Sequence, residues 1–262
     1  MHPNSTSVGM EAKFDIGEGW KIKNSARFSA NSGSFVSPFP AEVASASSIA
    51  DSFGTGSTLQ FVDGTAVPTN SLVARIHMFD VELNNFNNFM NDFKLQKSFE
   101  GVDLTVGYFK SLQNVSMSWL WNSYLMEVKG DNAALLDVED SNGNLLSDNG
   151  LYAYGVPAWG NCCQRNYDLS YSIRAPYLAL STEIGDFTID ASIRRDEGEA
   201  NGTYAGAVQQ TIDMNGDGNL SIPEQSVSAI DNANPQIANY EWAYTSYSVG
   251  SNYSLNKNNS LF

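Results

Sequence analysis

The stretch MEAKFDIGEGWKIKNSARFS, residues 10–29, decides the fold, because apolar and polar side chains alternate along it twice with a glycine turn between the two runs. In the first run three polar residues oppose four apolar ones, Met10, Ala12, Phe14 and Ile16. After the turn at residues 17–19, one face carries Trp20, Ile22, Ala26 and Phe28, and the other carries Lys21, Lys23, Ser25, Arg27 and Ser29. A period of two is the signature of a β-strand. The stretch therefore predicts a hairpin with one apolar and one strongly polar face.

The same alternation recurs along the chain. Residues 89–111 predict a second hairpin that turns at residues 100–101, and residues 167–194 predict a third that turns at Gly185. A further alternating segment, residues 240–255, is rich in tyrosine. In the third hairpin the apolar residues change phase around Ala175 and Pro176, so we expect a β-bulge or an edge irregularity there. A small hairpin is expected across residues 140–143, and residues 116–128 fit a strand or a short helix.

Two polar segments interrupt the pattern, at about residues 31–70 and 197–238, the first with a short helix near residues 41–51. Loops of this length are uncommon in compact soluble domains but ordinary on the external side of a membrane barrel, whose opposite turns are short. A β-sandwich has more even connections. We therefore expect an all-β fold, an antiparallel transmembrane β-barrel segment of about eight to ten strands of a larger barrel with long external loops.

The composition limits the classes of function. Asp and Glu outnumber Lys and Arg by 29 to 14 in 262 residues, which disfavours nucleic acid as a partner because no cationic surplus displaces counterions from phosphates. The apolar runs are far shorter than the roughly 20 residues that a membrane-spanning helix needs. Residues 1–10 are polar and do not resemble a signal peptide, as in a cytosolic protein or an internal segment of a longer one. We expect the internal segment.

The two cysteines are adjacent, Cys162 and Cys163. Two thiols are too few for a structural zinc site with four ligands. A disulfide between neighbouring residues is strained, although an oxidising compartment permits it. The sequence leaves open whether these residues form that disulfide or are two thiols packed in a loop.

A family resemblance rests on three stretches. They are NCCQRNYDLSYSIRAPYLALSTEIGDFTIDASIRRDEGEANGTYAG (residues 161–206), NDFKLQKSFEGVDLTVGYFKS (residues 91–111) and YTSYSVGSNYSLNKNNSLF (residues 244–262). With them, the chain from about residue 8 to its end resembles the barrel of TonB-dependent outer-membrane receptors. The patterns are of moderate specificity, because none is an active-site signature.

The resemblance implies a barrel of about 22 strands around an N-terminal plug, located in the outer membrane of a Gram-negative bacterium. It implies uptake of an iron-siderophore or a similarly bulky nutrient, with membrane lipid and, through the plug, the TonB complex as partners. Residues 1–262 then form a partial receptor barrel. No stretch of them resembles the plug domain, the TonB-contacting box or the terminal aromatic strand.

A calcium loop is the sharpest local motif, DMNGDGNLSIPE at residues 213–224. Gly218 occupies its sharp-turn sixth position, and oxygen ligands fall at positions 1, 3, 5, 7, 9 and 12, namely Asp213, Asn215, Asp217, Asn219 (through its carbonyl), Ser221 and Glu224. Pro223 and the polar surroundings argue against paired EF-hand helices. We expect a single Ca²⁺ loop in an external segment, the alternative being a solvated acidic loop. The similar stretch at residues 137–148 loses the spacing and predicts a hairpin turn.

The sequence predicts no enzyme. Neither His2 nor His77 lies in a motif that makes a base or a metal ligand. Candidate ligand-binding residues are polar and aromatic side chains of a loop, namely Trp159, Asn161 and Arg165. Charged residues on the polar strand faces are expected to line a wet interior, namely Lys21, Lys23, Arg27, Asp190, Arg194 and Arg195.

The principal alternative is a soluble or cell-surface calcium-binding β protein, such as an adhesin-like sandwich. An enzyme on a β scaffold is a third, more distant reading, and it needs a carboxylate pair in a cleft. The first two differ in where four apolar side chains point, namely Phe14, Phe28, Ile189 and Val249. A dry interior between two sheets favours the sandwich, and an outward belt favours the barrel.

Overall fold

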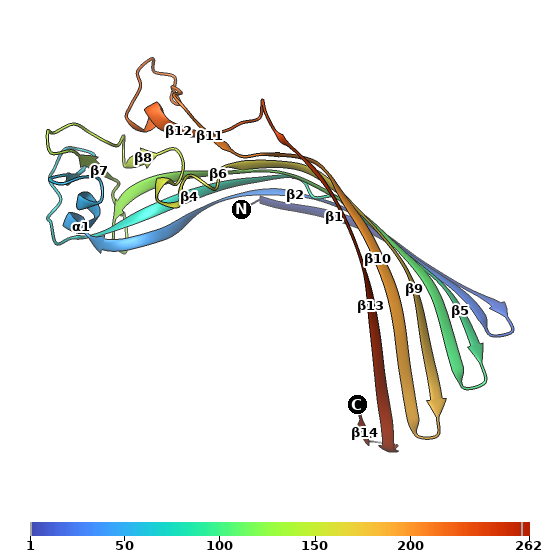
Figure 1. Cartoon of the computed structure of the whole chain (residues 1–262). Helices are drawn as coiled ribbons and strands as arrows, with labels where there is room; N and C mark the ends of the chain where they lie inside the picture. The colour runs from blue at the N-terminus through green and yellow to red at the C-terminus, as the bar shows by residue number, and fades with distance from the viewer. Residues whose placement is uncertain (1, 258) are drawn as a thin grey trace.

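The computed structural model describes residues 2–257 and 259–262, and one large antiparallel sheet dominates it (Figure 1). Its ten strands are β1 (His2–Gly17), β2 (Trp20–Ser45), β4 (Leu72–Asn85), β5 (Asn88–Phe99), β6 (Val102–Glu127), β8 (Leu151–Ala153), β9 (Arg165–Ile184), β10 (Phe187–Ala205), β13 (Gln236–Asn256) and β14 (Asn259–Leu261). Apart from β4 and β5, long strands that follow one another along the chain are neighbours in the sheet. The prediction of an all-β antiparallel fold is confirmed.

Strands β4 and β5 lie end to end and share the place between β2 and β6. Asn31 of β2 binds the segment between them. Its Nδ2 donates to the carbonyl of Phe86 at 3.1 Å, and its backbone N–H donates to Asn87 Oδ1 at 3.0 Å. On the other side, Gln113 Nε2 of β6 donates to the Phe86 carbonyl at 3.2 Å. The sheet therefore continues across a break in one strand.

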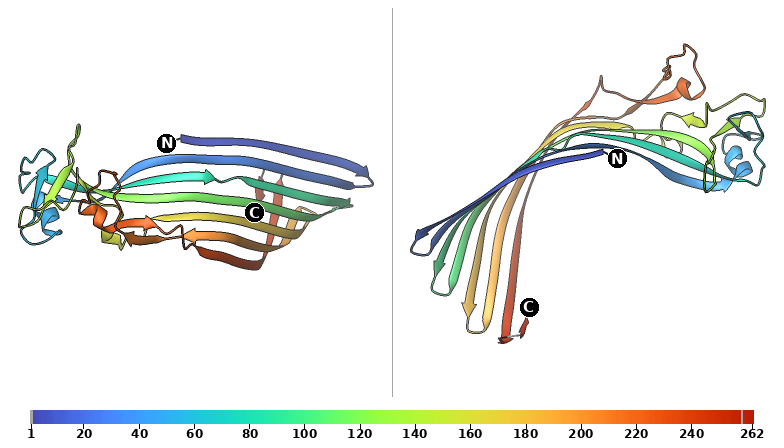
Figure 2. Two further views of the ribbon diagram at one scale, coloured as in Figure 1. Left: turned by 90° about the horizontal axis from the view of Figure 1, so that it is seen from above. Right: turned by 180° about the vertical axis from the view of Figure 1, so that it is seen from behind.

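Short turns close one end of the sheet, and a cap of loops covers the other end (Figure 2). In the first turn Gly17, Glu18 and Gly19 all have positive φ, which glycine adopts at no steric cost. A side chain at Gly19 would also meet the Ser98 carbonyl oxygen, with the added Cβ only 2.5 Å away. Backbone geometry therefore favours glycine at both positions, and at Gly19 the neighbouring backbone requires it as well.

The cap at the loop end holds the hydrophobic core. It contains helix α1 (Ala46–Asp51), the pair β3 (Thr58–Phe61) and β7 (Leu136–Glu139), and β8, while 3₁₀ helix η1 (Pro157–Trp159) lies nearby in the chain. Side chains of these elements pack on the ends of β4 and β6, and the buried cluster is Ala46, Ile49, Ala50, Leu59, Val67, Val73, Leu125, Leu136, Val138, Tyr152 and Ala153. A separate lobe is formed by β11 (Ala207–Gln210), η2 (Pro223–Ser226) and β12 (Val227–Ile230). No helix in the described part of the chain combines the length and the apolar character needed to cross a membrane.

Both predicted long loops are shorter than expected. The first, predicted at residues 31–70, is wrong at its start because β2 continues to Ser45, paired with β4. The second, predicted at residues 197–238, is wrong at both ends because β10 continues to Ala205 and β13 begins at Gln236. The predicted helix starts later, with Ser45 as its N-cap. Backbone pairing extends these strands although their side chains do not alternate.

The undecided segment at residues 116–128 is strand, the end of β6. The turn at residues 140–143 forms as predicted: Asp140 accepts hydrogen bonds from the amides of Asn142 and Asn144 at 2.8 and 2.9 Å. However, the main partner of β7 is the distant strand β3.

The bulge expected at Ala175 and Pro176 does not form, because pairing of β9 with β6 runs through both residues without a shift. The alternative, a local irregularity, is present: pairing of β9 with β10 is interrupted at these two residues and resumes in register at Arg174 and Glu197. The apolar residues change phase because they lie on one face of the sheet before these two residues and on the opposite face after them.

Candidate functional site

One row of apolar side chains crosses seven neighbouring strands. Register pairs each residue with the next across the sheet, in the order Phe14, Ile22, Leu95, Val106, Leu178, Ile193 and Tyr247. Directly paired residues lie on the same face. We call the face that carries this row face A and the opposite one face B.

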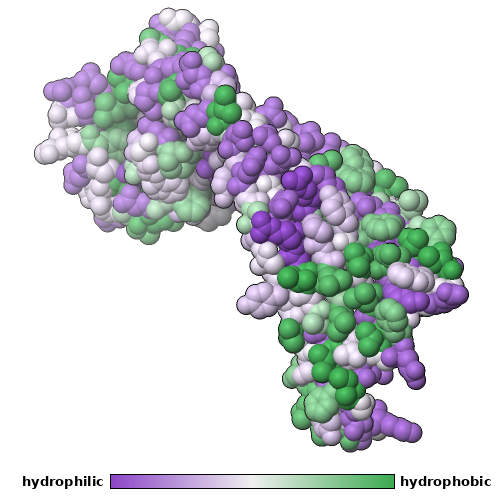
Figure 3. Space-filling model, turned by 45° about the vertical axis from the view of Figure 1, so that its right-hand side comes forward, coloured by the Kyte–Doolittle hydropathy of each residue, from purple (hydrophilic) through white to green (hydrophobic). Residues whose placement is uncertain are grey.

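Further apolar rows adjoin this one, most of them toward the turns and one, with Phe93, Tyr108 and Pro176, toward the loops. Together they form the belt: Phe14, Ile16, Trp20, Ile22, Phe93, Leu95, Phe99, Val102, Leu104, Val106, Tyr108, Pro176, Leu178, Leu180, Phe187, Ile189, Ala191, Ile193, Tyr247, Val249 and Tyr253. Many of these side chains are exposed, with 61% of the accessible surface retained by Phe14 and 84% by Tyr247. Hydrophobic side chains gather over the arm that holds the turns (Figure 3). An apolar surface of this extent needs a cover other than water.

Face B of the same strands is charged. One cross-strand row places Lys13, Lys23 and Lys94 in line, with Arg194 further along it, and the next row places Glu11, Asp92 and Asp196. Ion pairs join the two rows: Lys13 and Lys23 reach Glu11 at 2.8 and 2.9 Å, Lys94 reaches Asp92 at 3.0 Å, and Arg194 reaches Asp196 at 2.7 Å. Face B therefore carries paired charges on the side of the sheet opposite the belt.

Polar groups continue along face B toward the turns. A hollow of about 430 Å³ is lined mainly by hydroxyl and charged side chains, among them Lys21, Thr105, Ser181, Asp190 and Ser192. Nearby, the Tyr177 hydroxyl donates to Asp92 at 2.8 Å. Of the residues predicted to line a wet interior, Lys21, Lys23, Arg27, Asp190 and Arg194 share this face, whereas Arg195 lies on face A.

The apolar side of the sheet changes toward the loops. In β6 the apolar residues leave face A after Leu112 and continue on face B at Trp119 and Trp121. In β13 the change falls between Tyr247 on face A and Tyr244 on face B. The line of change runs obliquely across the sheet and passes Ala175 and Pro176 in β9. We call the part on the turn side of this line the turn half and the rest the loop half.

An aromatic cluster covers face B in the loop half. Its rings are Phe35, Phe39, Phe79, Trp119, Trp121 and Trp159, together with the imidazole of His77. Trp159 comes from the loop after β8, and its centroid lies 4.7 Å from His77 and 5.8 Å from Trp121. Edge-to-face contacts of this kind stabilise beyond the buried area alone.

The three predicted ligand residues have different places in this region. Trp159 belongs to the cluster, and the Arg165 guanidinium lies 4.5 Å from the centroid of Trp119. Asn161 lies in the connecting loop with a positive φ of 55°. Sequence reasoning missed Trp119, Trp121 and His77. A period-two reading of residues 116–128 would have found the two tryptophans on one face.

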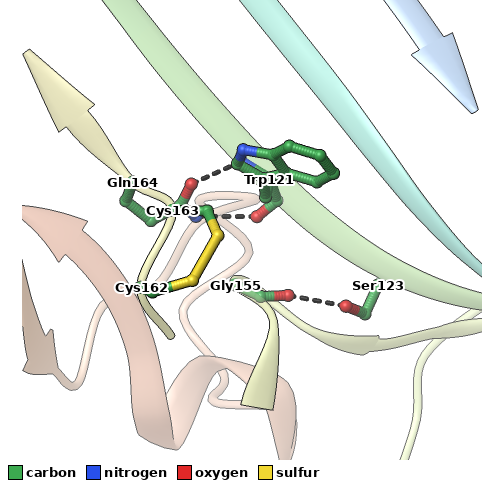
Figure 4. Close-up of a disulfide and its surroundings, with 6 residues drawn as sticks. All are labelled: Trp121, Ser123, Gly155, Cys162, Cys163 and Gln164. Carbon is green, nitrogen blue, oxygen red and sulfur yellow. Dashed lines mark hydrogen bonds between the residues drawn. A yellow bond between two sulfur atoms is a disulfide. The ribbon is translucent and has the colours of Figure 1, made fainter. Parts of the chain in front are cut away.

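Side-chain hydrogen bonds fasten the loop to β6 (Figure 4). Gln164 acts like one more strand residue, because its amide accepts from the Trp121 N–H and donates to the Trp121 carbonyl at 2.7 Å. Ser123 Oγ donates to the Gly155 carbonyl at 2.6 Å. Cys162 and Cys163, which precede Gln164, are joined by a disulfide, the first of the two states that the sequence left open.

The protonation of His77 follows from these bonds. Ser123 gives its only proton to Gly155, so it must accept from His77 Nδ1–H, 2.8 Å away, and Nε2 carries the lone pair. Burial, and secondarily the charge of Arg75, lowers the pKa of His77 to about 4. The ring is neutral at physiological pH.

Several buried polar atoms near the cluster have no hydrogen-bond partner among the described residues. Donors are Nε1 of Trp119 and of Trp121 and Nε of Arg165, and acceptors are His77 Nε2 and Asn161 Oδ1. Most buried polar groups in proteins are paired, so such a concentration calls for an explanation. Rings and N–H donors together suit a ligand with flat or apolar parts and acceptor oxygens.

The predicted calcium loop is closed on itself by its own side chains. Asp213 accepts from the amides of Gly216 and Gly218 at 2.6 and 2.9 Å. Buried Glu224 accepts from the Met214 amide at 2.8 Å and the Asn215 amide at 3.2 Å. Glu224 also accepts hydrogen bonds from the hydroxyl and the backbone amide of Ser221, at 2.7 and 2.9 Å. The hydrogen bonds to the carboxylate, those from Ser221 first, lower the pKa of Glu224.

This loop geometry fits a cation only in part. The Asp213 bond to Gly218 joins positions 1 and 6 and gives the bend that a calcium loop requires, with φ of Gly218 at 83°. Glu224, however, is engaged by four donors. Within residues 2–257 and 259–262, no three His, Cys, Asp or Glu side chains are arranged to hold a metal. Binding Ca²⁺ therefore requires Glu224 to release amides of the loop.

The chain was compared with models of known protein families, with curated proteins and with solved structures, and none of the three comparisons gave a match.

Proposed function

We propose that the chain is part of a TonB-dependent receptor in the outer membrane of a Gram-negative bacterium, which takes up a siderophore or a similarly bulky nutrient. The observation that carries the proposal is the pair of adjacent faces in the turn half. Seven strands share an apolar row on face A, exposed in five of them and half-buried at Ile22 and Leu95, and the paired charges lie one residue away on face B. Lipid outside and water inside a barrel select for this arrangement.

The length of the belt fits a bilayer. On the flank of the sheet the apolar positions of face A reach beyond the belt residues named above, over residues 8–16 in β1 and, with Asn91 and Lys97 as polar residues among them, over residues 89–99 in β5. A tilted transmembrane strand needs about 9–11 residues. On β10 the belt is shorter and stops at Ile193, because Arg195 and Glu197 follow on the same face.

The soluble sandwich explains these faces less well. Phe14, Phe28 and Val249 are exposed, and Ile189 is half-buried, whereas a sandwich needs them between two sheets. A barrel wall also accounts for charge on the other face. In this orientation the long loops lie outside the cell, and the aromatic cluster with Trp159 and Arg165 is the proposed place of ligand contact.

Brominated-lipid quenching of tryptophan fluorescence tests the membrane location. In phosphatidylcholine vesicles with brominated acyl chains, Val106→Trp on face A adds fluorescence that is quenched. Thr105→Trp on face B adds fluorescence that is not quenched, because this side chain lines the polar hollow. The five native tryptophans give the same background in both variants. Equal quenching of the two variants, or a chain that stays soluble without lipid, contradicts the proposal.

A second experiment tests the ligand. Ferric catecholate and ferric hydroxamate siderophores are titrated into the vesicle-inserted chain, and binding is followed by tryptophan fluorescence. Trp159→Ala and Arg165→Gln remove a ring and a donor from the cluster, and each is expected to weaken binding about tenfold or more. Trp20→Ala, in the belt, is the control and leaves binding unchanged. Affinity that is unaffected by the cluster variants places the ligand elsewhere.

We propose calcium binding by residues 213–224 as a second activity, favoured by the bond between Asp213 and Gly218. Calorimetric titration with Ca²⁺ is expected to show one site that Asp213→Asn and Glu224→Gln abolish. Asp140→Asn, in the turn that resembles this loop but lacks the spacing, is the control. Millimolar affinity suffices outside the cell. Heat release that persists in both loop variants excludes this site.

A further inference from the structure

Three cations stand at the loop-side edge of the belt, on three neighbouring strands. Arg174 lies two positions beyond Pro176 in β9, and Arg195 follows Ile193 by two positions in β10, in each case directly past the last apolar residue of the belt. Lys110 follows Tyr108, the last belt residue of β6, and one more apolar residue of face A, Leu112, lies farther toward the loops. Two positions along a strand return to the same face. The cations therefore point outward, as the belt does, and not toward the charged wall of face B.

One carboxylate organises two of these cations. Glu197 accepts from Arg174 Nε at 2.9 Å and lies 3.7 Å from Arg195 Nε. Lys110 donates to Ser172 Oγ at 2.6 Å. The cluster carries three positive charges against one negative charge. It therefore keeps a surplus of positive charge, although the whole chain has a net charge of −15.

The surroundings give the cluster the shape of a binding site. Lys110, Arg174 and Glu197 help to line a hollow of about 460 Å³ on the outer surface. Glu199 and Glu241, paired with each other across the strands, line it one row farther from the belt. Lys110 and Arg174 thus lie on the side of the hollow that is nearer the apolar surface, and Arg195 lies one row nearer still.

We infer that Lys110, Arg174 and Arg195 bind the phosphate of an anionic lipid whose acyl chains lie against the belt. This inference rests on the proposed membrane location, because the edge of an apolar belt coincides with the level of the head groups. Cations at that level attract anionic lipids, and guanidinium groups suit phosphate oxygens. Continuity with the belt selects a lipid over a soluble anion, since one molecule can fill both surfaces.

Vesicle partitioning tests the inference. The full chain is mixed with vesicles of phosphatidylcholine alone and of phosphatidylcholine with phosphatidic acid, and the ratio of the two partition coefficients is the readout. Lys110→Gln is expected to lower the preference for phosphatidic acid about fivefold. The triple variant with Arg174→Gln and Arg195→Gln is expected to abolish it. The charge-matched control carries Lys21→Gln, Lys97→Gln and Lys129→Gln, which lie outside the cluster, and keeps the preference.

Each outcome of the partitioning experiment supports or overturns the lipid-binding site. A preference retained by the triple variant, or lost equally by the control, overturns the inference, because net charge alone would then govern binding. Displacement of the lipid by inorganic phosphate also overturns it, since the site would then take a soluble anion. Failure of the unaltered chain to enter pure phosphatidylcholine vesicles counts against the membrane location instead. Loss of entry by the triple variant there marks a folding defect, in which case Lys110→Gln alone, with its control Lys97→Gln, decides by the same ratio.

Discussion

The two halves of the sheet differ in which face is covered by protein. Two pairs of adjacent residues show the difference: Leu178 and Ala179 in the turn half, and Leu120 and Trp121 in the loop half. In the turn half, the residue on face A is an exposed apolar side chain and its neighbour on face B lines a polar hollow. In the loop half, Leu120 on face A is 41% exposed and Trp121 on face B is buried at 9%. One continuous sheet thus has its dry, protein-covered side only near the loops.

Alternating apolar side chains therefore face two different environments in this protein. Near the loops, apolar side chains point to face B because the cap and Trp159 cover them, as in a soluble core. Near the turns, they point to face A, where no element of the described chain covers them. Substitutions of neighbouring residues on opposite faces therefore test whether the two halves differ in this way.

The largest effect is expected for Trp121→Ala. Removing a buried indole from the aromatic cluster leaves a cavity and is expected to cost about 3–5 kcal/mol in the free energy of unfolding. Leu120→Ala, on the exposed face of the same strand, is expected to cost less than about 1 kcal/mol. Urea unfolding in detergent micelles, followed by near-ultraviolet circular dichroism, measures both. Equal costs contradict the assignment of face B as the packed side.

Leu180→Arg is expected to have the next largest effect, and only in a bilayer, because Leu180 lies on face A two positions deeper in the belt than Leu178, whose row adjoins the cations at the belt's edge. A charge on the lipid face near the middle of a membrane costs about 2–4 kcal/mol. Ala179→Arg places the same charge on face B, where the hollow has room, and is expected to change stability little. Unfolding of the chain in phosphatidylcholine vesicles gives the two free energies. A larger loss for Ala179→Arg reverses the sidedness that we propose.

Gly198→Ala probes close packing at the boundary of the halves. The Trp242 ring lies so close over Gly198 that an added Cβ would come within 2.1 Å of it. Displacing the ring is expected to cost about 1–3 kcal/mol of unfolding free energy. Gly250→Ala is the control, because the added Cβ meets no atom within 4 Å. Thermal unfolding separates the two variants, and an unchanged midpoint for Gly198→Ala rules out this contact.

The effect that is smallest near neutral pH is a pH dependence confined to the loop half. Because the pKa of His77 falls from 6.5 to about 4 on folding, the unfolded chain binds a proton between these values that the folded chain does not. The contribution is complete above pH 6.5 and is lost as the pH falls toward 4, by at most about 1.4 kcal/mol per pH unit. His77→Gln should flatten this slope of the unfolding free energy. An identical slope in the variant assigns the dependence to other groups.

The hairpins of the turn half were predictable in detail. Alternation in residues 10–29 predicted Phe14 and Ile22 on the apolar face of one hairpin with a glycine turn, and the two residues pair there. Local pattern suffices because one face of this hairpin is apolar except for Asn24 and the other face is wholly polar. The end of β2 was missed because Ser, Ala and Pro residues between Asn31 and Ser45 carry little contrast, and pairing with β4 holds them extended.

The candidate site was predictable only in fragments. Trp159 and Arg165 were found as loop residues, but Trp119, Trp121 and His77 join them through strands that are distant in sequence. The bulge expected in β9 was wrong for a related reason. Tyr171 and Leu178 lie on opposite faces of a regular strand, and the environment changes between them while the backbone does not.

The sequence by itself determined where strands alternate, where glycine reverses the chain, and that the sheet is antiparallel. These features depend on neighbouring residues, whose geometry repeats every two positions. Only the tertiary structure decided which rows align across seven strands, that Lys13, Lys23 and Lys94 face carboxylates, and that the apolar side crosses the sheet. The physical reason is that alternation gives each strand two faces, whereas register and the cap decide what each face meets.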